Sequence, residues 1–232
     1  GKSFNWVGNR KLKYRKNPMW NDGVYIFKEL DRISESDLER VSMILPEYRL
    51  EKVKKYKRDL DRKNCVIAYL LLTIALKREF NIEGRIAMDY GIHGKPYLKE
   101  YQDVYFNFSH CSQGMVCAVS INDIGVDIET IDEKRMFFSS DIFSPKELEF
   151  IVNSQKEDFF RLWVLKEATV KCTGIGLVYG SNYIEFLTPK DGTFCKDEFV
   201  YHLKKIGSMY LAVCSKYPVR YQMVTRKELL NI

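Results

Sequence analysis

Two acidic residues alternate with branched apolar residues in the stretch 125–129, which reads Gly-Val-Asp-Ile-Glu. This alternation predicts a β-strand from which Asp127 and Glu129 point to the same side of the sheet. Unpaired carboxylates side by side repel each other and are costly on a half-buried strand. A divalent cation removes the repulsion, because carboxylate and phosphate oxygens are the usual ligands of Mg²⁺. The bland alternative is two solvated acids on an edge strand.

A second stretch, residues 160–171, reads Phe-Arg-Leu-Trp-Val-Leu-Lys-Glu-Ala-Thr-Val-Lys. We expect it to belong to one bounded helix. Ser154 and Glu157 are a candidate capping box at its start, and Gly174 follows its last turn.

One face of this helix carries an aromatic residue, an acid and a base at the spacing i, i+4, i+8: Trp163, Glu167 and Lys171. Glu167 would complete a three-carboxylate metal site with Asp127 and Glu129, and Lys171 lies one turn beyond it. The ordinary alternative is a surface ion pair between Glu167 and Lys171, worth about 0.3–0.5 kcal/mol.

Together with Gly174-x-Gly176-Leu177, these two stretches resemble the signature of the 4'-phosphopantetheinyl transferases, and the length and upstream segments resemble the Sfp-like subfamily. The resemblance runs from about Tyr25 to the C-terminus. It implies an α+β fold of two similar mixed α/β subdomains, related by a pseudo-twofold axis, with the active site in the cleft between them. The implied reaction is Mg²⁺-dependent, with Mn²⁺ as an alternative ion. It transfers the 4'-phosphopantetheine arm of coenzyme A to a serine of an acyl or peptidyl carrier protein and releases 3',5'-ADP.

The resemblance also implies roles for the acidic and basic residues above. Asp127, Glu129 and Glu167 would hold the metal ion. Glu167 is in addition the candidate base for the serine hydroxyl, directly or through a water. Lys171 would bind the coenzyme and stabilise or protonate the leaving phosphate.

A run of cations in residues 51–58 is the first of three expected coenzyme-binding segments. Such a run is often only a solvated face. In the resembling family a lysine of this segment contacts the coenzyme phosphates, and Lys52 is the matching position. Because this chain carries one extra residue here, the sequence leaves open whether Arg49 or Lys52 makes the larger contribution.

A Gly-Lys-Pro turn within residues 90–98 is the second segment. Its glycine allows close approach of the backbone, and its lysine supplies charge, although a common surface turn would look the same. In the family this element lines the adenine and phosphate end of coenzyme A, which assigns contacts to His93, Gly94, Lys95 and Pro96.

The third segment is the alternating stretch 106–111, which ends in Ser109, His110 and Cys111. Its Asn-x-Ser-His pattern resembles another coenzyme-binding element of the family, in which Ser and His contact phosphate. We therefore assign that role to Ser109 and His110. The family often has Ser where this chain has Cys111. A hydrolase pair is not indicated, because no acid or nucleophile elbow accompanies Ser109.

The formal net charge of +6 suits an anionic ligand or partner but does not identify one. RNP-like aromatic motifs, zinc-finger spacing and homeodomain patterns are missing from the sequence, so we do not expect a nucleic-acid partner. Two alternatives to the transferase remain: a non-catalytic basic nucleotide- or nucleic-acid-binding module, and an unrelated metal-dependent phosphohydrolase. The expected partner is an acidic carrier domain, but which carrier, and which acyl forms of coenzyme A are tolerated, is open.

The longest apolar run, within residues 65–76, is too short to span a bilayer, and the six cysteines include no C-x-x-C pair. We therefore expect no membrane association, a cytoplasmic location and buried free thiols. A two-subdomain chain can form its cleft within one copy, so a monomer is expected.

Three segments make up the predicted organisation of the chain. Residues 1–18 are expected to be a basic arm or a tag remnant, before a plausible start at Met19. Residues 19–122 form the N-terminal subdomain with most coenzyme contacts, and residues 123–232 form the C-terminal subdomain with the metal motifs. A site built from both halves would bridge them.

Periodicity and turn signals predict the individual elements. A capping box with Ser144, Pro145 and Glu147 should open a helix. Further helices are expected at Ser36–Leu45 and Asp61–Phe80, and strands at Val24–Phe27, Met115–Ile121, Ile124–Glu129, Tyr183–Leu187, Glu198–Leu203 and Met209–Cys214.

The connection Thr130–Ile142 leaves the mouth of the predicted site and is rich in large apolar residues and cations. We expect the carrier protein to dock beside it. The alternative is that these apolar groups pack onto their own subdomain. The residues concerned are Lys134, Arg135, Met136, Phe137, Phe138, Ile142 and the following Phe143.

Overall fold

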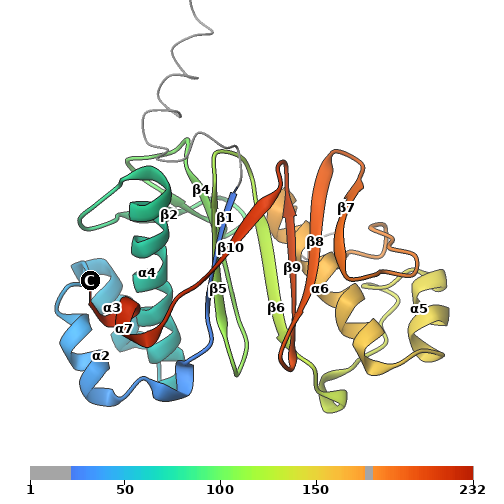
Figure 1. Ribbon diagram of the computed structural model, residues 1–232, viewed down its shortest axis with the longest axis horizontal. Helices are drawn as coiled ribbons and strands as arrows, with labels where there is room; N and C mark the ends of the chain where they lie inside the picture. The colour runs from blue at the N-terminus through green and yellow to red at the C-terminus, as the bar shows by residue number, and fades with distance from the viewer. Residues whose placement is uncertain (1–21, 176–179, 232) are drawn as a thin grey trace, which may run out of the picture.

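Two four-stranded sheets form the centre of the computed structural model, which describes residues 22–175 and 180–231 (Figure 1). The first sheet has the order β10-β1-β5-β4, with β1 (Asp22–Phe27), β4 (Tyr105–His110), β5 (Met115–Ser120) and β10 (Val219–Met223). The second has the order β6-β9-β8-β7, with β6 (Gly125–Thr130), β7 (Gly192–Lys196), β8 (Phe199–Ile206) and β9 (Met209–Ser215). A small hairpin pairs β2 (Met88–Tyr90) with β3 (Pro96–Leu98).

One long helix packs on each sheet: α4 (Asp59–Phe80) on the first and α6 (Lys156–Thr173) on the second (Figure 1). The expected α+β class is confirmed by these helices and sheets. The shorter elements are η1 (Leu30–Arg32), α2 (Glu35–Ser42), α3 (Glu47–Lys55), η2 (Glu133–Arg135), α5 (Pro145–Val152) and α7 (Arg226–Leu230).

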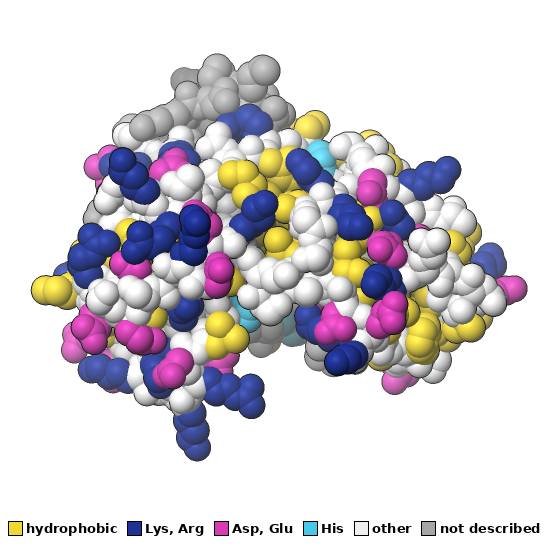
Figure 2. Space-filling view, turned by 60° about the horizontal axis from the view of Figure 1, so that its bottom comes forward, with side chains coloured by type: hydrophobic (Ala, Val, Ile, Leu, Met, Phe, Trp, Pro, Cys, Tyr) yellow, Lys and Arg dark blue, Asp and Glu magenta, His cyan; other side chains and the backbone are white. Residues whose placement is uncertain are grey.

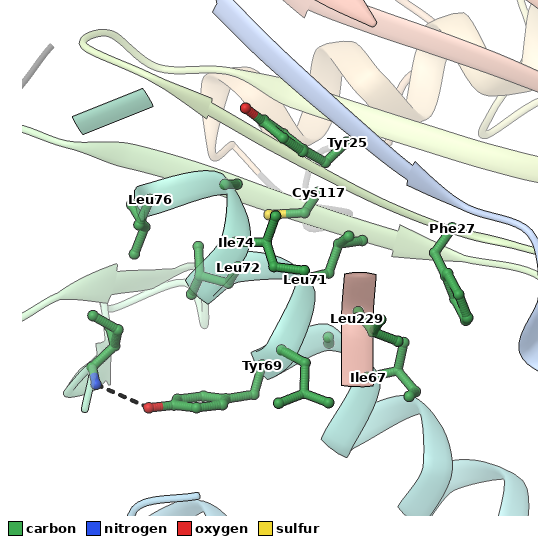
Figure 3. Packing of buried hydrophobic residues seen from close by; sticks show 14 of the residues in the cluster. Tyr25, Phe27, Ile67, Tyr69, Leu71, Leu72, Ile74, Leu76, Cys117 and Leu229 are labelled. Atoms are coloured by element: carbon green, nitrogen blue, oxygen red, sulfur yellow. Dashed lines mark hydrogen bonds between the residues drawn. The ribbon is translucent and has the colours of Figure 1, made fainter. Parts of the chain in front are cut away.

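Apolar side chains of α4 form the first core against the inner strands of their sheet. Figure 3 shows Leu71 and Ile74 of the helix beside Cys117 of β5, with Leu229 of α7 against the same helix. Each fully buried aliphatic side chain of this kind contributes about 1.5–3 kcal/mol of burial free energy. The long apolar helix predicted at Asp61–Phe80 is therefore confirmed, with its start two residues earlier, at Asp59.

The two sheets also pack against each other. Their shared apolar cluster combines Val24 and Ile26 of β1 with Val126 and Ile128 of β6 and Val213 of β9. The residues that alternate with these on the same strands face the helices, as Tyr25 does toward α4. The strands are thus covered on both faces, which explains why β1, β5 and β9 are buried along their full lengths.

Local signals predicted one helix start correctly and another wrongly. Ser144 and Glu147 form the expected capping box of α5. The capping box proposed for Ser154 is wrong: α6 begins at Lys156 with Gln155 as its N-cap, and the Ser154 hydroxyl donates to the carbonyl of Phe150. Because Ser154 closes the last turn of the preceding helix, its hydroxyl is used there.

The C-terminal segment returns to the first sheet, which differs from the predicted C-terminal subdomain of residues 123–232. Strand β10 pairs in parallel with β1, in the register Asp22 opposite Val219. The predicted strand at Tyr183–Leu187 is also wrong, since these residues form turns and bends. The expectations for residues 1–18, Gly176 and Leu177 lie outside the described residues.

The six cysteines are free thiols, and five of them are buried, as expected. Cys195 on the edge strand β7 is the exposed one. None of the described helices combines the length and the hydropathy needed to cross a bilayer.

Candidate active site

The facing edges of the two sheets are joined by side chains of β4. Asn107 Oδ1 accepts the backbone N–H of Val126 at 2.9 Å, and Ser109 Oγ accepts that of Ile128 at 3.0 Å. Both pairs follow the strand period of two, so the Asn-x-Ser pattern satisfies two edge N–H groups of β6. This role of Asn107 was missed from the sequence, although the alternation of the segment already placed it on the same face as Ser109.

Asp127 lies at the centre of this junction and is almost fully buried. Its Oδ1 accepts from the Ser109 hydroxyl at 3.0 Å and from Lys171 Nζ at 2.8 Å. Lys171 also donates to the carbonyl of Val126 at 3.1 Å. The ion pair therefore joins α6 to β6. Lys171 thus pairs with Asp127, whereas the alternative prediction from the sequence was a surface ion pair between Lys171 and Glu167. Since the Ser109 hydroxyl proton points to Asp127, Ser109 orients this carboxylate.

Glu167 and Glu129 are half-buried neighbours of Asp127. Burial and then the Asp127 charge raise the pKa of Glu167 to about 7. The same two causes, in the same order, raise the pKa of Glu129, while Arg135 opposes the shift. Glu129 and Glu167 thus share an electrostatic environment in which their negative charge is unfavourable, with the Asp127 carboxylate as a common cause.

The carboxylates are held by cations of the chain itself. Lys171 pairs with Asp127, and Arg135 Nη2 lies 3.0 Å from Glu129 Oε2. Within residues 22–175 and 180–231, no three or more His, Cys, Asp and Glu side chains are grouped as metal ligands. Asp127 Oδ2 is nevertheless buried without a hydrogen-bond partner among the described residues. This free oxygen lies beside Glu129 and Glu167, whose charged forms are disfavoured. Such a group of oxygens fits a hard divalent cation.

Gly125 lets α6 lie directly on β6. A Cβ at this position would fall 2.0 Å from the carbonyl oxygen of Ala168 and 2.4 Å from the backbone nitrogen of Cys172. Both are backbone atoms of α6, so a side chain cannot be accommodated without moving the helix. The helix then ends, as predicted, at Gly174, with a φ of 70°.

A pocket of about 230 Å³ opens beside Lys171. Lys95 in its wall donates to Asp123 Oδ1 at 3.1 Å and to the carbonyl of Cys172 at 3.4 Å, so it joins the turn to the C-terminal end of α6. The turn itself needs Gly94, whose φ is 78°. The predicted turn residues thus meet α6 in one pocket, lined by His93, Gly94, Lys95, Pro96, Asn107, Val170, Lys171 and Gly174.

His110 follows Ser109 at the exposed end of β4. Its Nδ1 lies 3.4 Å from the amide nitrogen of Asn64 on α4, a neighbour that was missed from the sequence because the two are far apart in the chain. Partial burial, followed by the Lys171 charge, lowers the pKa of His110. The imidazole is therefore favoured in its neutral form.

Lys52 and Arg49, the two candidates on α3, have different surroundings. Lys52 Nζ donates to the hydroxyl of Tyr90 at 2.5 Å, directly before the Gly-Lys-Pro turn. Arg49 is buried and donates to the carbonyl of Cys65 at 3.0 Å, which ties α3 to α4. Lys52 is thus the partly accessible cation near the turn, and Arg49 is part of the helix packing.

Lys166, directly before Glu167 on α6, is fully buried. The sequence did not predict this burial. Its Nζ donates to Glu147 Oε1 at 2.7 Å and to the carbonyl of Ile184. Burial lowers the pKa of Lys166, and the Glu147 carboxylate opposes the shift. The capping residue of α5 thereby also fixes the face of α6 that presents Glu167.

The apolar residues of Thr130–Ile142 mostly pack onto their own half, as the alternative interpretation held. Met136, Phe137 and Ile142 are partly buried against the second core, and Phe137 contacts Trp163 edge-on with ring centroids 4.8 Å apart. Phe138 is the exception, with 52% of its surface exposed.

Known proteins provide an independent comparison. The family model of the 4'-phosphopantetheinyl transferase superfamily matches residues 123–221. A 4'-phosphopantetheinyl transferase of Bacillus subtilis is 30% identical over 162 residues, 67% of this chain and 70% of the relative. The transferase Sfp of Bacillus subtilis (strain 168) is 28% identical over 161 residues, again 67% and 70% of the two chains. HetI of Nostoc sp. is 29% identical over 185 residues, 74% of this chain and 77% of the relative.

The family-model match includes both motif-bearing stretches, and the structure brings the acidic strand and the Trp163–Lys171 face together through the Asp127–Lys171 ion pair. The chain therefore belongs to the 4'-phosphopantetheinyl transferase superfamily and is an enzyme that transfers 4'-phosphopantetheine from coenzyme A to carrier proteins.

Proposed function

We propose that this enzyme uses a divalent cation, Mg²⁺ or Mn²⁺, held by Asp127, Glu129 and Glu167, to modify a serine of an acidic acyl or peptidyl carrier domain. The observation that carries this proposal is the buried, unpartnered Oδ2 of Asp127, in contact through Oδ1 with the lysine of the catalytic helix. When bound, the ion would neutralise charge on the coenzyme diphosphate. The active site is the cleft between two pseudo-twofold-related halves.

The chain's own residues supply binding and proton transfer. Lys171 faces both the pocket and Asp127, so it can stabilise or protonate the departing 3',5'-ADP phosphate. Glu167, one turn before it on α6, is the base for the serine hydroxyl. Its half-buried position beside Asp127 keeps its basicity useful near neutral pH.

Coenzyme binding is assigned to the residues around the 230 Å³ pocket and to the cation beside it. Lys95 and His110 would contact phosphate, with His93, Gly94 and Pro96 lining the nucleotide end. Ser109 acts mainly through Asp127. Lys52 joins the site through Tyr90.

Carrier docking is assigned to Thr130–Ile142, with Phe138 as its exposed apolar contact and Lys134 and Arg135 as neighbouring cations. Acidic groups on the carrier would meet these cations first, which speeds encounter, and the apolar contact would slow release. The residues assigned to the site all come from one copy of the chain, which supports a monomer. We also place the enzyme in the cytoplasm.

Figure 2 bears on the alternative of a basic nucleic-acid-binding module. On the face shown, Lys and Arg side chains are spread out, with Asp and Glu among them, instead of forming one continuous stripe. A binding module would in addition leave the Asp127–Lys171 arrangement without a function.

The test is mass spectrometry of an apo carrier protein incubated with the enzyme, coenzyme A and Mg²⁺. We expect a mass gain of one phosphopantetheine arm on the carrier serine, and loss of this product in excess chelator. Full modification in the presence of chelator would contradict the metal assignment. Free pantetheine phosphate without modified carrier would instead indicate a phosphohydrolase.

A further inference from the structure

Glu129 has two partners outside the other proposed metal ligands. Arg135 Nη2 lies 3.0 Å from its Oε2, with the Glu129 side chain 16% exposed and that of Arg135 49% exposed. The indole of Trp163 is the second partner: burial raises the pKa of Glu129, and Trp163 is one of the neighbours that oppose this shift. One partner is therefore about half exposed to solvent, and the other belongs to α6.

Both partners are connected to the proposed docking segment. Arg135 is the last residue of η2, which Asp132 caps by accepting the backbone N–H of Lys134 at 3.0 Å. Two residues further on, Phe137 packs edge-on against Trp163. A partner that docks on this segment thus touches the residues that fix Glu129.

A guanidinium and a divalent cation compete for the same carboxylate. While Arg135 pairs with Glu129, the carboxylate has one oxygen occupied and less net charge to offer a metal ion. Acidic groups on a docked carrier would give Arg135 another partner. Two binding events that compete for one residue in this way are thermodynamically coupled, and the coupling is reciprocal.

We propose that Arg135 is a positioning residue that holds Glu129 in the free enzyme and releases it to the divalent cation when an acidic carrier domain binds. Carrier docking would then tighten metal binding, and the metal would tighten carrier docking. This inference rests on the proposed metal role of Glu129.

The test measures Mn²⁺ binding, from the paramagnetic resonance signal of the free ion, without coenzyme A. Arg135→Gln should bind Mn²⁺ about two- to five-fold more tightly than the wild type, the range expected for a partly exposed ion pair. Arg135→Lys keeps a cation and should remain near the wild type. Lys134→Gln removes the same charge from the neighbouring residue of η2 and is the matched control. Thermal unfolding verifies that all variants are folded.

A second titration adds apo acyl carrier protein, with the carrier alone as the blank. The carrier should tighten Mn²⁺ binding to the wild type by a similar factor and leave Arg135→Gln unchanged. Two results would overturn this inference and leave the metal site standing. One is equal Mn²⁺ affinity of Arg135→Gln and wild type without carrier. The other is a gain in Mn²⁺ affinity from Lys134→Gln as large as that from Arg135→Gln. If the folded wild type bound no Mn²⁺, with or without carrier, both the inference and the proposed metal site would fall.

Discussion

Asp127 shows how one residue is fixed by its neighbours for a chemical role. Ser109 and Lys171 both donate to Oδ1, which leaves Oδ2 free in a buried position. A carboxylate held in this way has little freedom to turn, so the ordering cost of ligand binding is reduced before a ligand arrives. Burial, followed by the charge of Asp127, raises the pKa of the neighbouring Glu167 to about 7.

Replacing Lys95 by Ala should weaken coenzyme A binding by about ten- to 150-fold, because a charge-assisted hydrogen bond contributes about 1.5–3 kcal/mol. The chemical step should slow less. Calorimetric titration and single-turnover rates separate the two effects. Lys99→Ala is the control, since Lys99 is an exposed cation paired with Asp89. Unchanged affinity of Lys95→Ala would remove this residue from the coenzyme site.

His202 should make stability depend on pH. Burial lowers its pKa in the folded protein, whereas an unfolded histidine titrates near about 6.5. As the pH falls below about 6.5, the unfolded chain binds a proton that the folded chain does not, so the free energy of unfolding decreases. His202→Gln should make this decrease shallower, by at most about 1.4 kcal/mol per pH unit. Urea denaturation from pH 7 to pH 5 measures it, with the exposed His93→Gln as control; identical slopes for His202→Gln and wild type would refute the assignment.

At the scale of elements, the contact between β6 and α6 determines the site. Lys171 and Glu167 reach Asp127 only because Gly125 brings the two backbones together. Buried Lys166 and Glu147 then fix the rotation of the helix from its other side. Gly125 and Lys166 of the two motifs are thus explained by packing, while the neighbouring acids Asp127 and Glu167 are the ones proposed to carry the chemistry.

Gly125→Ala should destabilise the fold by about 1–3 kcal/mol, because its methyl group would overlap backbone atoms of α6. Transfer activity should fall as well, since α6 has to move. Urea denaturation measures the first effect, and the transfer rate at saturating coenzyme A measures the second. Gly91→Ala is a suitable stability control, because its Cβ would meet the nearest atom at an ordinary 3.5 Å. Wild-type stability of Gly125→Ala would contradict the close-packing argument.

The sequence predicted those elements whose signals are local. Ser144 caps α5 because its partner Glu147 lies three residues away, and α4 is identifiable from its length and apolar composition. Strand β10 was not predicted, since its five residues are stabilised by parallel pairing with β1, about two hundred residues earlier. The Asn64–His110 contact was not predicted for the same reason. Arg135 and Glu129 are close in the sequence, but their ion pair depends on how η2 turns the chain back toward β6, which residue periodicity does not specify. The roles assigned to the acids and bases of the two motifs stay predictions.

At the scale of the whole molecule, the return of β10 to β1 joins the two ends of the described chain in one sheet (Figure 1). The sheets share a core through β1, β5, β6 and β9, and β4 bonds to β6 at their facing edges. The residues proposed to bind coenzyme A in one half and the acidic residues of the other are therefore held at a fixed distance. A carrier approaching along Thr130–Ile142 would meet a preformed site.

Phe138→Ala should raise the KM for the carrier protein several-fold and leave coenzyme A affinity unchanged. Phe138 is the exposed aromatic of this segment, and its loss removes apolar contact area at the interface. Val152→Ala, an exposed apolar change on α5, serves as the control. Steady-state kinetics with varied carrier concentration measure the effect, and an unaltered carrier KM would place the docking surface elsewhere.

The central claim is that the buried charge of Asp127 is required for metal-dependent transfer. Its most direct test is the single-turnover rate of phosphopantetheine transfer, followed by mass spectrometry of the carrier, over a range of Mn²⁺ concentrations. Asp127→Asn keeps the shape of the side chain but removes the charge, and it should transfer at least about a hundred-fold more slowly at every Mn²⁺ concentration. Glu83→Gln, which removes an exposed acid far from the docking segment in the sequence, should match the wild type. Transfer by folded Asp127→Asn at the wild-type rate, with the same Mn²⁺ dependence, would contradict the claim.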